Sequence, residues 1–177
     1  MDLLYYDANG HDRELKPEEL SQVVFGESSL LWINGEAGDL SGLDLPKPLT
    51  DAMRCIRRTP ENVRVYEEFY TFAIPVLPSS GEAISAELVL AVGQDWLISV
   101  GPSDATDFAA LIERDVGDTM KGNLSGTTLA AALLAEHFAR FHQHIAAIDA
   151  EIDKVEQRTL TGKEGRSTLS VLTVLRD

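Results

Sequence analysis

The sequence predicts an α/β fold in which a mixed, largely antiparallel sheet flanked by helices occupies residues 1–100 and a long helical arm occupies residues 101–177. Three observations lead to this prediction. Short runs of β-branched and aromatic residues alternate with turn sequences as far as Val100, as they do in the strands of a sheet. The composition changes at Gly101-Pro102, and the residues beyond follow helical periodicity. Hydrophobic residues then recur at steps of four and three, the spacing of a helix that packs against another helix.

The first part of the chain is predicted to alternate strands with helices. The runs LLYY at 3–6 and SLLWI at 29–33 precede the turn sequences DANG and NGEAGD, so each run is predicted as a strand. Between them, Pro17 stands in the first turn of a predicted helix and is followed by two glutamates, which a helix amino terminus favours. Another helix is predicted over 48–58, because its apolar residues share one face and its arginines point away from it.

Three neighbouring antiparallel strands are predicted for the rest of the sheet. Residues 63–77 are rich in β-branched and aromatic side chains, and residues 86–100 read as two strands about the turn Gly93-Gln94-Asp95. Because sequential strands usually lie side by side, these three should pair with one another. Trp32 and Trp96 both lie in apolar strand patterns and are therefore expected inside the packing of the sheet.

The chain beyond residue 101 is predicted to be helical. A first helix is capped by Ser103 or Asp104, a long helix runs from about 127 to about 161, and a further helix begins at 166–177 with an incomplete apolar pattern. The long helix carries a row of hydrophobic residues that repeats as 4-3-4-3-4-3 and predicts a partner helix. This row, the apolar seam, consists of Leu134, Phe138, Phe141, Ile145, Ile148, Ile152 and Val155.

The charge of the chain excludes some partners and favours others. Lysine and arginine number 15 against 29 aspartates and glutamates, for a formal net charge of -14. Such a field repels phosphate and attracts cations, so nucleic acid is not expected as a partner. The single Cys55 predicts neither a disulfide nor a zinc framework and fits a reducing compartment. No secretory signal and no apolar run of about 20 residues is present, so we expect a soluble chain.

The candidate chemical groups favour diffuse attraction of cations over catalysis. His137, His142 and His144 are too far apart on a helix to form a metal site and are expected at the hydrated surface. Cys55 lies among arginines without a histidine partner, and no phosphate-binding or nucleophile motif is present, so we predict no enzyme activity and no tightly bound cofactor. The metal candidates are a strip of carboxylates that could attract cations without coordinating them directly: Asp149, Glu151, Asp153 and Glu156.

Five segments, taken in order, resemble the cytoplasmic part of CorA-type divalent-cation transporters, a superfamily with ZntB-like members. These segments are SLLWINGEAGD, RVYEEFYTFAIPVL, ELVLAVGQDWLISVG, FAALIERD and IDAEIDKVEQRTL, and the last fits the family pattern Ile-Asp-x-Glu-Ile-Asp-x-Leu/Val-Glu. The resemblance implies an α/β/α funnel domain followed by a helical hairpin that packs against a stalk helix. It also implies a homopentamer in the bacterial inner membrane, with this domain on the cytoplasmic side and magnesium, cobalt or zinc as the transported ion.

The resemblance extends to the cytosolic part alone. The family's membrane hairpin and Gly-Met-Asn pore signature are absent from this sequence, so we expect an excised domain whose membrane segments are missing and whose self-association is weakened. Asp51 is the loose counterpart of the Leu-Glu-Asp motif that feeds a metal-sensing site in magnesium-type members, so that site is not carried over and the ion stays open. The alternative is a stand-alone soluble binding or assembly module of the same fold without transport activity.

Overall fold

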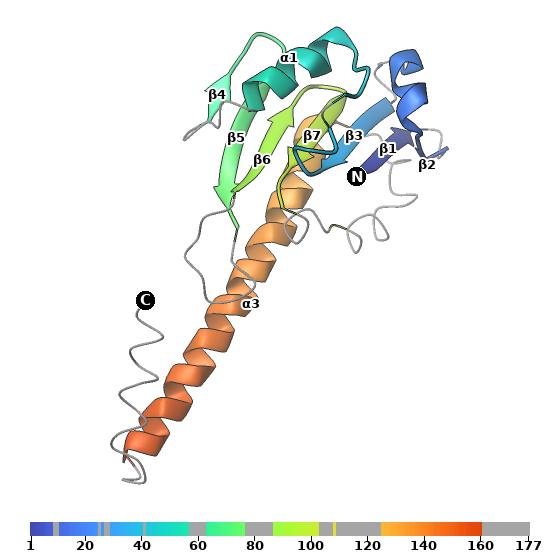
Figure 1. Cartoon of the computed structure of the whole chain (residues 1–177). Coiled ribbons are helices and arrows are strands. Elements are labelled where there is room, and N and C mark those ends of the chain that lie inside the picture. Colours follow the sequence, from blue (N-terminus) through green and yellow to red (C-terminus); the bar gives the residue numbers. More distant parts are fainter. Residues whose placement is uncertain are drawn as a thin grey trace. The chain divides into compact units, whose positions relative to one another are not determined.

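The computed structural model describes residues 1–8, 11–24, 26, 29–40, 42–56, 63–76, 87–102, 108 and 125–160, with only the backbone at 159 and 160. The predicted helix near residue 104, apart from Phe108, and the one over 166–177 lie outside these residues. The elements, in chain order (Figure 1), are β1 Asp2–Asp7, β2 Arg13–Glu14, the 3-10 helix η1 Pro17–Gln22, β3 Ser29–Gly35, α1 Lys47–Ile56, β4 Arg64–Val65, β5 Tyr70–Pro75, β6 Glu87–Val92, β7 Trp96–Val100 and α3 Gly126–Leu160.

The described strands form one seven-stranded sheet in the order β2-β1-β3-β7-β6-β5-β4. Strands β3 and β7 at its centre are parallel, with Trp32 opposite Leu97 and Ile33 opposite Ile98. The other neighbouring strands pair antiparallel. The prediction of a mixed, largely antiparallel sheet is therefore confirmed, as is the antiparallel run of β5, β6 and β7.

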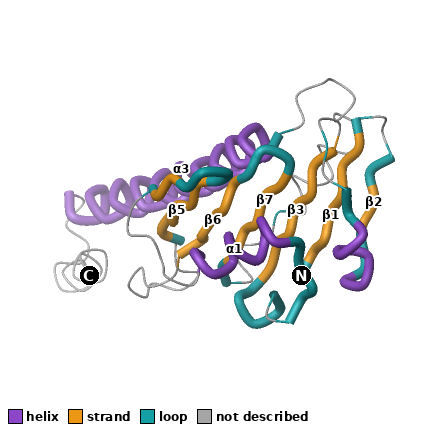
Figure 2. The backbone as a smooth tube through the Cα atoms, turned by 90° about the horizontal axis from the view of Figure 1, so that it is seen from above, coloured by secondary structure: helices purple, strands orange, loops and turns teal. Residues whose placement is uncertain are grey.

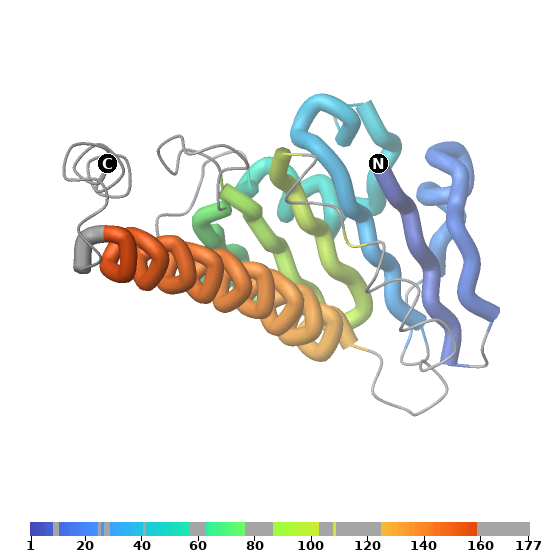
Figure 3. The backbone as a smooth tube through the Cα atoms, turned by 90° about the horizontal axis from the view of Figure 1, so that it is seen from below, coloured from blue at the N-terminus to red at the C-terminus, as the bar shows by residue number. Residues whose placement is uncertain are grey.

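Helical segments of the first unit pack on both faces of its sheet, which Figures 2 and 3 show from opposite sides. Successive side chains of a strand point to opposite faces. Ile33 of β3 accordingly packs in one cluster with residues of α1 and η1, whereas Trp32 packs in the other cluster with Leu129 and Leu133 from the first turns of α3. All seven residues of β3 are buried, as expected for a strand covered on both faces. The predicted flanking of the sheet by helices is thus confirmed.

A chain of hydrogen bonds runs through the centre of this core. Trp32 Nε1 donates to Ser99 Oγ at 2.9 Å, and Ser99 Oγ donates to Asn34 Oδ1 at 2.7 Å. Asn34 Nδ2 then donates to Asp2 Oδ2 at 2.8 Å, nearer the surface. The hydroxyl of Ser99 therefore links β3 to β7 through side chains as well as through the backbone ladder. The predicted burial of Trp32 and Trp96 is confirmed, since they are 0% and 5% exposed.

The long helix α3 begins in close contact with the turn between β6 and β7. Ser125 caps it, because Ser125 Oγ accepts from Thr128 N and Ser125 N donates to Thr128 Oγ1, both at 3.1 Å. Gly126 N donates to Gln94 O at 2.8 Å, and a Cβ at Gly126 would lie 2.2 Å from Gly93 O. Only glycine allows this approach. The predicted helix over 127–161 is confirmed within a residue at each end, and its 35 residues extend about 52 Å.

The chain forms two compact units, Met1–Leu134 and Ala135–Asp177, so the change of unit falls inside α3. The division that the sequence predicts at residue 100 is of a different kind, because it marks the change from strands to helices along the chain. In the second unit, much of the apolar seam faces outward: Phe138, Ile145 and Ile148 are 54%, 52% and 36% exposed, whereas Val155 is buried. The partner helix that the seam predicts stays a prediction.

Two local predictions were wrong, and one strand was not predicted. The strand predicted over 63–77 is divided into β4 and β5 by a turn at Glu67 and Glu68, where Tyr66 N donates to Phe69 O at 2.8 Å and the two rings stack. The helix predicted at Pro17 is a six-residue 3-10 helix. The edge strand β2 was not predicted, because two exposed residues carry no periodic pattern.

Candidate functional site

The four carboxylates predicted to attract cations, here called the α3 carboxylates, are all exposed on the second unit: Asp149, Glu151, Asp153 and Glu156. Because a helix turns about 100° per residue, Asp149, Asp153 and Glu156 fall on one strip. Glu151 lies on another side of the helix, so the four do not form one continuous strip. The structure therefore separates Glu151 from the other three.

Glu151 has a local cationic partner. Lys154 Nζ donates a hydrogen bond to Glu151 Oε1 one helical turn away, and the two side chains form an ion pair. This hydrogen bond and the charge of Lys154 hold the pKa of Glu151 below its ordinary value, with a smaller contribution from Arg158. Glu151 is consequently ionised over a wider range of pH than an isolated glutamate, although part of its charge is compensated by Lys154.

In the described part of the chain, the histidines of α3 do not form a metal-binding group with these carboxylates. His142 and His144 are exposed, as predicted, but the prediction is wrong for His137, which is 5% exposed. The centres of the Phe138 and Phe141 rings lie 6.4 and 5.0 Å from the centre of the His137 ring, so the imidazole has aromatic neighbours on its own helix. Within the described residues, no three histidine, cysteine, aspartate or glutamate side chains gather closely enough to hold a metal ion.

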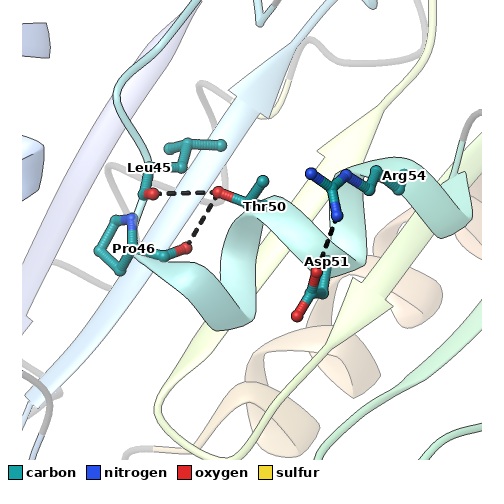
Figure 4. Close-up of polar contacts among 5 residues, drawn as sticks. All are labelled: Leu45, Pro46, Thr50, Asp51 and Arg54. Atoms are coloured by element: carbon teal, nitrogen blue, oxygen red, sulfur yellow. Dashed lines mark hydrogen bonds and ion pairs between the residues drawn. The ribbon is translucent and has the colours of Figure 1, made fainter.

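Asp51, the remaining metal candidate, lies half-buried on α1 beside Arg54 (Figure 4). Its carboxylate faces the guanidinium of Arg54, with 3.4 Å between Oδ1 and Nη1. Thr50 fastens the first turn of this helix by donating to the carbonyl oxygens of Leu45 and Pro46 at 3.0 and 3.3 Å. Beside Asp51 lies a depression of about 390 Å³ whose lining includes Lys47, Glu67 and Glu68. Asp51 thus lies near two further carboxylates and one lysine, and it is already paired with Arg54.

A larger cavity, of about 600 Å³, was not predicted. It lies at the carboxyl ends of β3 and β7 and is lined by Glu36, Glu87 and mostly apolar residues. Glu36 follows a strongly apolar run in the sequence, which is a weak signal for a site at a strand end. The cavity itself could not be inferred from the sequence, because it depends on the parallel pairing of strands that are far apart in the chain.

Within the described parts of the chain, no helix combines sufficient length with sufficient hydropathy to cross a bilayer.

Comparison with known proteins identifies the fold. No protein-family model and no curated protein matches the sequence. Among solved structures, the complete CorA magnesium transporter from Methanocaldococcus jannaschii aligns with a TM-score of 0.68 and 15% identity, covering 99% of this chain and 56% of that chain. The full-length CmaX protein aligns with a TM-score of 0.65 and 15% identity, covering 93% of this chain and 53% of that chain.

A third similar structure is the ZntB cytoplasmic domain from Vibrio parahaemolyticus, with a TM-score of 0.50 and 15% identity over 98% of this chain and 70% of that chain. The chain spans about half the length of the full-length CorA and CmaX proteins that it matches. The alignments include both the sheet and α3, since they cover nearly all of this chain. The chain therefore has the fold of a CorA-type cytoplasmic domain.

Proposed function

We propose that this chain is the cytoplasmic domain of a homopentameric divalent metal-cation transporter, in which it forms the funnel that ions pass and contributes to gating. The observation that carries this proposal is the alignment of 99% of the chain, sheet and long helix together, with a CorA magnesium transporter. The parent protein would lie in the bacterial inner membrane and would span it through segments outside this chain. The transported ion would be magnesium, cobalt or zinc.

The charge of the chain supports a role near a path for cations. Each copy has a formal net charge of -14, and the α3 carboxylates are all exposed. Because no three potential ligands gather within the described residues, the proposed action of the α3 carboxylates is a long-range field that raises the local cation concentration. Such a field decays over a Debye length of about 8 Å at physiological ionic strength. The divalent cation is therefore proposed as the transported ion and not as a tightly bound cofactor.

The apolar seam supports assembly. Phe138 and Ile145 each leave about half of their surface exposed along a helix whose apolar positions repeat with coiled-coil spacing. Exposed hydrophobic side chains in a row of this kind mark surfaces that another protein segment covers. In the proposed pentamer, the helices that continue from this chain would cover the seam. That the chain is not an enzyme stays a prediction.

The test starts with the complete gene. The reading frame beyond Asp177 should encode two apolar segments of about 20 residues each. The complete protein, purified and reconstituted in liposomes that contain a fluorescent indicator, should admit magnesium, cobalt or zinc when a gradient is applied. Empty liposomes and liposomes with the 177-residue chain alone are the controls.

The alternative function is a stand-alone binding or assembly module of the same fold. It predicts a stop codon directly after this chain and no cation flux from the complete protein. A stop codon would overturn the transporter proposal outright. Apolar segments followed by a complete absence of flux for all three ions would leave membrane attachment in place but overturn the proposed transport.

A further inference from the structure

The cavity at the carboxyl ends of β3 and β7 lies where the chain changes sides of the sheet. After β3 the chain leads to α1 on one face, and after β7 it leads to Phe108 and the first turns of α3 on the other face. Neighbouring parallel strands whose connections leave toward opposite faces open a crevice between them, and open α/β sheets commonly bind ligands there. The position of the cavity is therefore that of a ligand site.

The lining gives the cavity an apolar floor. Met53 and Ile56 reach it from α1, and Val89 and Val100 reach it from the sheet. All four belong to the buried cluster on this face of the sheet. The volume of about 600 Å³ falls within the range of roughly 300–1,000 Å³ that is typical of small-molecule sites. A ligand with an apolar body would thus displace water from apolar walls.

The polar groups of the cavity carry negative charge. Glu36 and Glu87 both line it with exposed side chains, and no lysine or arginine is among the described residues of the lining. Neither carboxylate forms an ion pair with a side chain in the described part of the chain. An anionic ligand would be repelled, and two carboxylates on an apolar floor provide too few oxygen ligands for a stable divalent metal site.

We propose that this cavity binds a small organic cation whose apolar body contacts the floor and whose ammonium or guanidinium group lies between Glu36 and Glu87. The two acids come from different segments, one after β3 and one at the start of β6, so a bound cation would connect two segments at the same end of the sheet. This inference is independent of the transport function, because it rests only on the lining of a cavity within the first unit.

The experiment uses the 177-residue chain and the probe 4-phenylbutylammonium. Its uncharged analogue, 4-phenylbutan-1-ol, has a similar apolar body and serves as the ligand control. In ¹H–¹⁵N correlation spectra, the ammonium probe should shift amides that line the cavity, among them Gly38, Val89 and Gly101, in a saturable manner. The double substitution Glu36→Gln and Glu87→Gln should weaken binding about fivefold, the effect expected of two exposed ion pairs.

A matched variant separates the local charges from the overall charge. Glu67→Gln with Glu68→Gln removes the same net charge from the smaller depression beside α1, and neither residue lines the cavity. This control should bind the probe as the unmodified chain does. The proposal would be overturned if the alcohol bound as tightly as the ammonium probe, or if the control pair weakened binding as much as the cavity pair does. It would also be overturned by amide shifts located outside the cavity, or by the absence of a saturable shift up to about 10 mM probe.

Discussion

Replacing Ser99 by alanine tests whether the buried hydrogen-bond chain stabilises the sheet. Ser99 and Trp32 are both 0% exposed, and Asn34 is 1% exposed. The substitution removes one oxygen atom and leaves the backbone pairing of β3 with β7 unchanged. Trp32 Nε1 would lose the acceptor 2.9 Å away, and Asn34 Oδ1 would lose the donor 2.7 Å away.

The expected loss of stability follows from these two bonds. A buried donor left without its acceptor costs about 1–3 kcal/mol, and a lost neutral hydrogen bond contributes about 1 kcal/mol more. Ser99→Ala should therefore lower the free energy of unfolding by about 2–4 kcal/mol. For a chain of this size, each kcal/mol lowers Tm by about 2–4 °C, so the expected decrease in Tm is about 5–15 °C.

Calorimetry and urea denaturation measure this effect, and Ser29→Ala supplies the matched control. Ser29 is also buried in the central sheet, but its hydroxyl makes only long bonds of 3.5 and 3.4 Å to the carbonyl oxygens of Val24 and Gly26. Its substitution should cost less than about 1 kcal/mol. A double-mutant cycle with Trp32→Phe isolates the indole bond, because Ser99→Ala should cost at least about 1 kcal/mol less in that background.

A free energy of unfolding for Ser99→Ala within about 0.5 kcal/mol of that of the unmodified protein would refute the reasoning. It would mean that the indole N–H finds another acceptor without cost. Equal costs for Ser99→Ala and Ser29→Ala would refute it as well, since only the former breaks short, buried bonds.

Further predictions concern the start of α3, its charges and its assembly. Gly126→Ala should destabilise the protein by about 1–3 kcal/mol in urea denaturation, because its Cβ would meet backbone atoms. Gly38→Ala should be nearly neutral, since a Cβ added there has no non-adjacent residue of the described chain within 4 Å. In carboxyl NMR titrations, Lys154→Ala should raise the pKa of Glu151 toward its ordinary value. Because that pKa is depressed in the folded protein, the stabilisation from the ion pair with Lys154 should be present at neutral pH and be lost as the pH falls through the pKa of Glu151. Neutralising all α3 carboxylates in the complete protein should lower cation flux modestly at low salt and hardly at high salt. Loss of flux from a single substitution would contradict the proposed action through a long-range field. The 177-residue chain should dissociate to monomers on dilution, and a concentration-independent pentamer in light scattering would contradict this.

The features that could be predicted from the sequence are those that local patterns determine. Gly126–Leu160 has a helical hydrophobic period and little to interrupt it, so its extent was predicted within a residue. The antiparallel strands β6 and β7 follow from a short turn between apolar runs. The split of the strand at Glu67 and Glu68 was missed, because two glutamates are no typical turn pair and the stacking of Tyr66 on Phe69 depends on the folded geometry.

The candidate site was only partly predictable for the same reason. The exposure of the α3 carboxylates follows from helical geometry and charge. The burial of His137 did not follow, because a histidine on the border of an apolar seam fits either environment. The parallel contact between β3 and β7 joins segments about 65 positions apart, as the bond from Ser99 to Asn34 shows, and short-range patterns carry no information about such a pairing. The cavity at the ends of β3 and β7 depends on this pairing, so it could not be predicted either.

The anchoring of α3 at one end makes local unfolding along this helix uneven. Leu129 and Leu133 are held in the buried cluster of the sheet, whereas the side chains from Phe138 to Lys154 are mostly exposed. Amides near Leu133 should therefore exchange with solvent deuterium only when the sheet itself opens, and those farther along should exchange by fraying of the helix alone. A segment that frays at low cost can be ordered by whatever binds the apolar seam, so its exchange rate would report directly on the arrival of a partner.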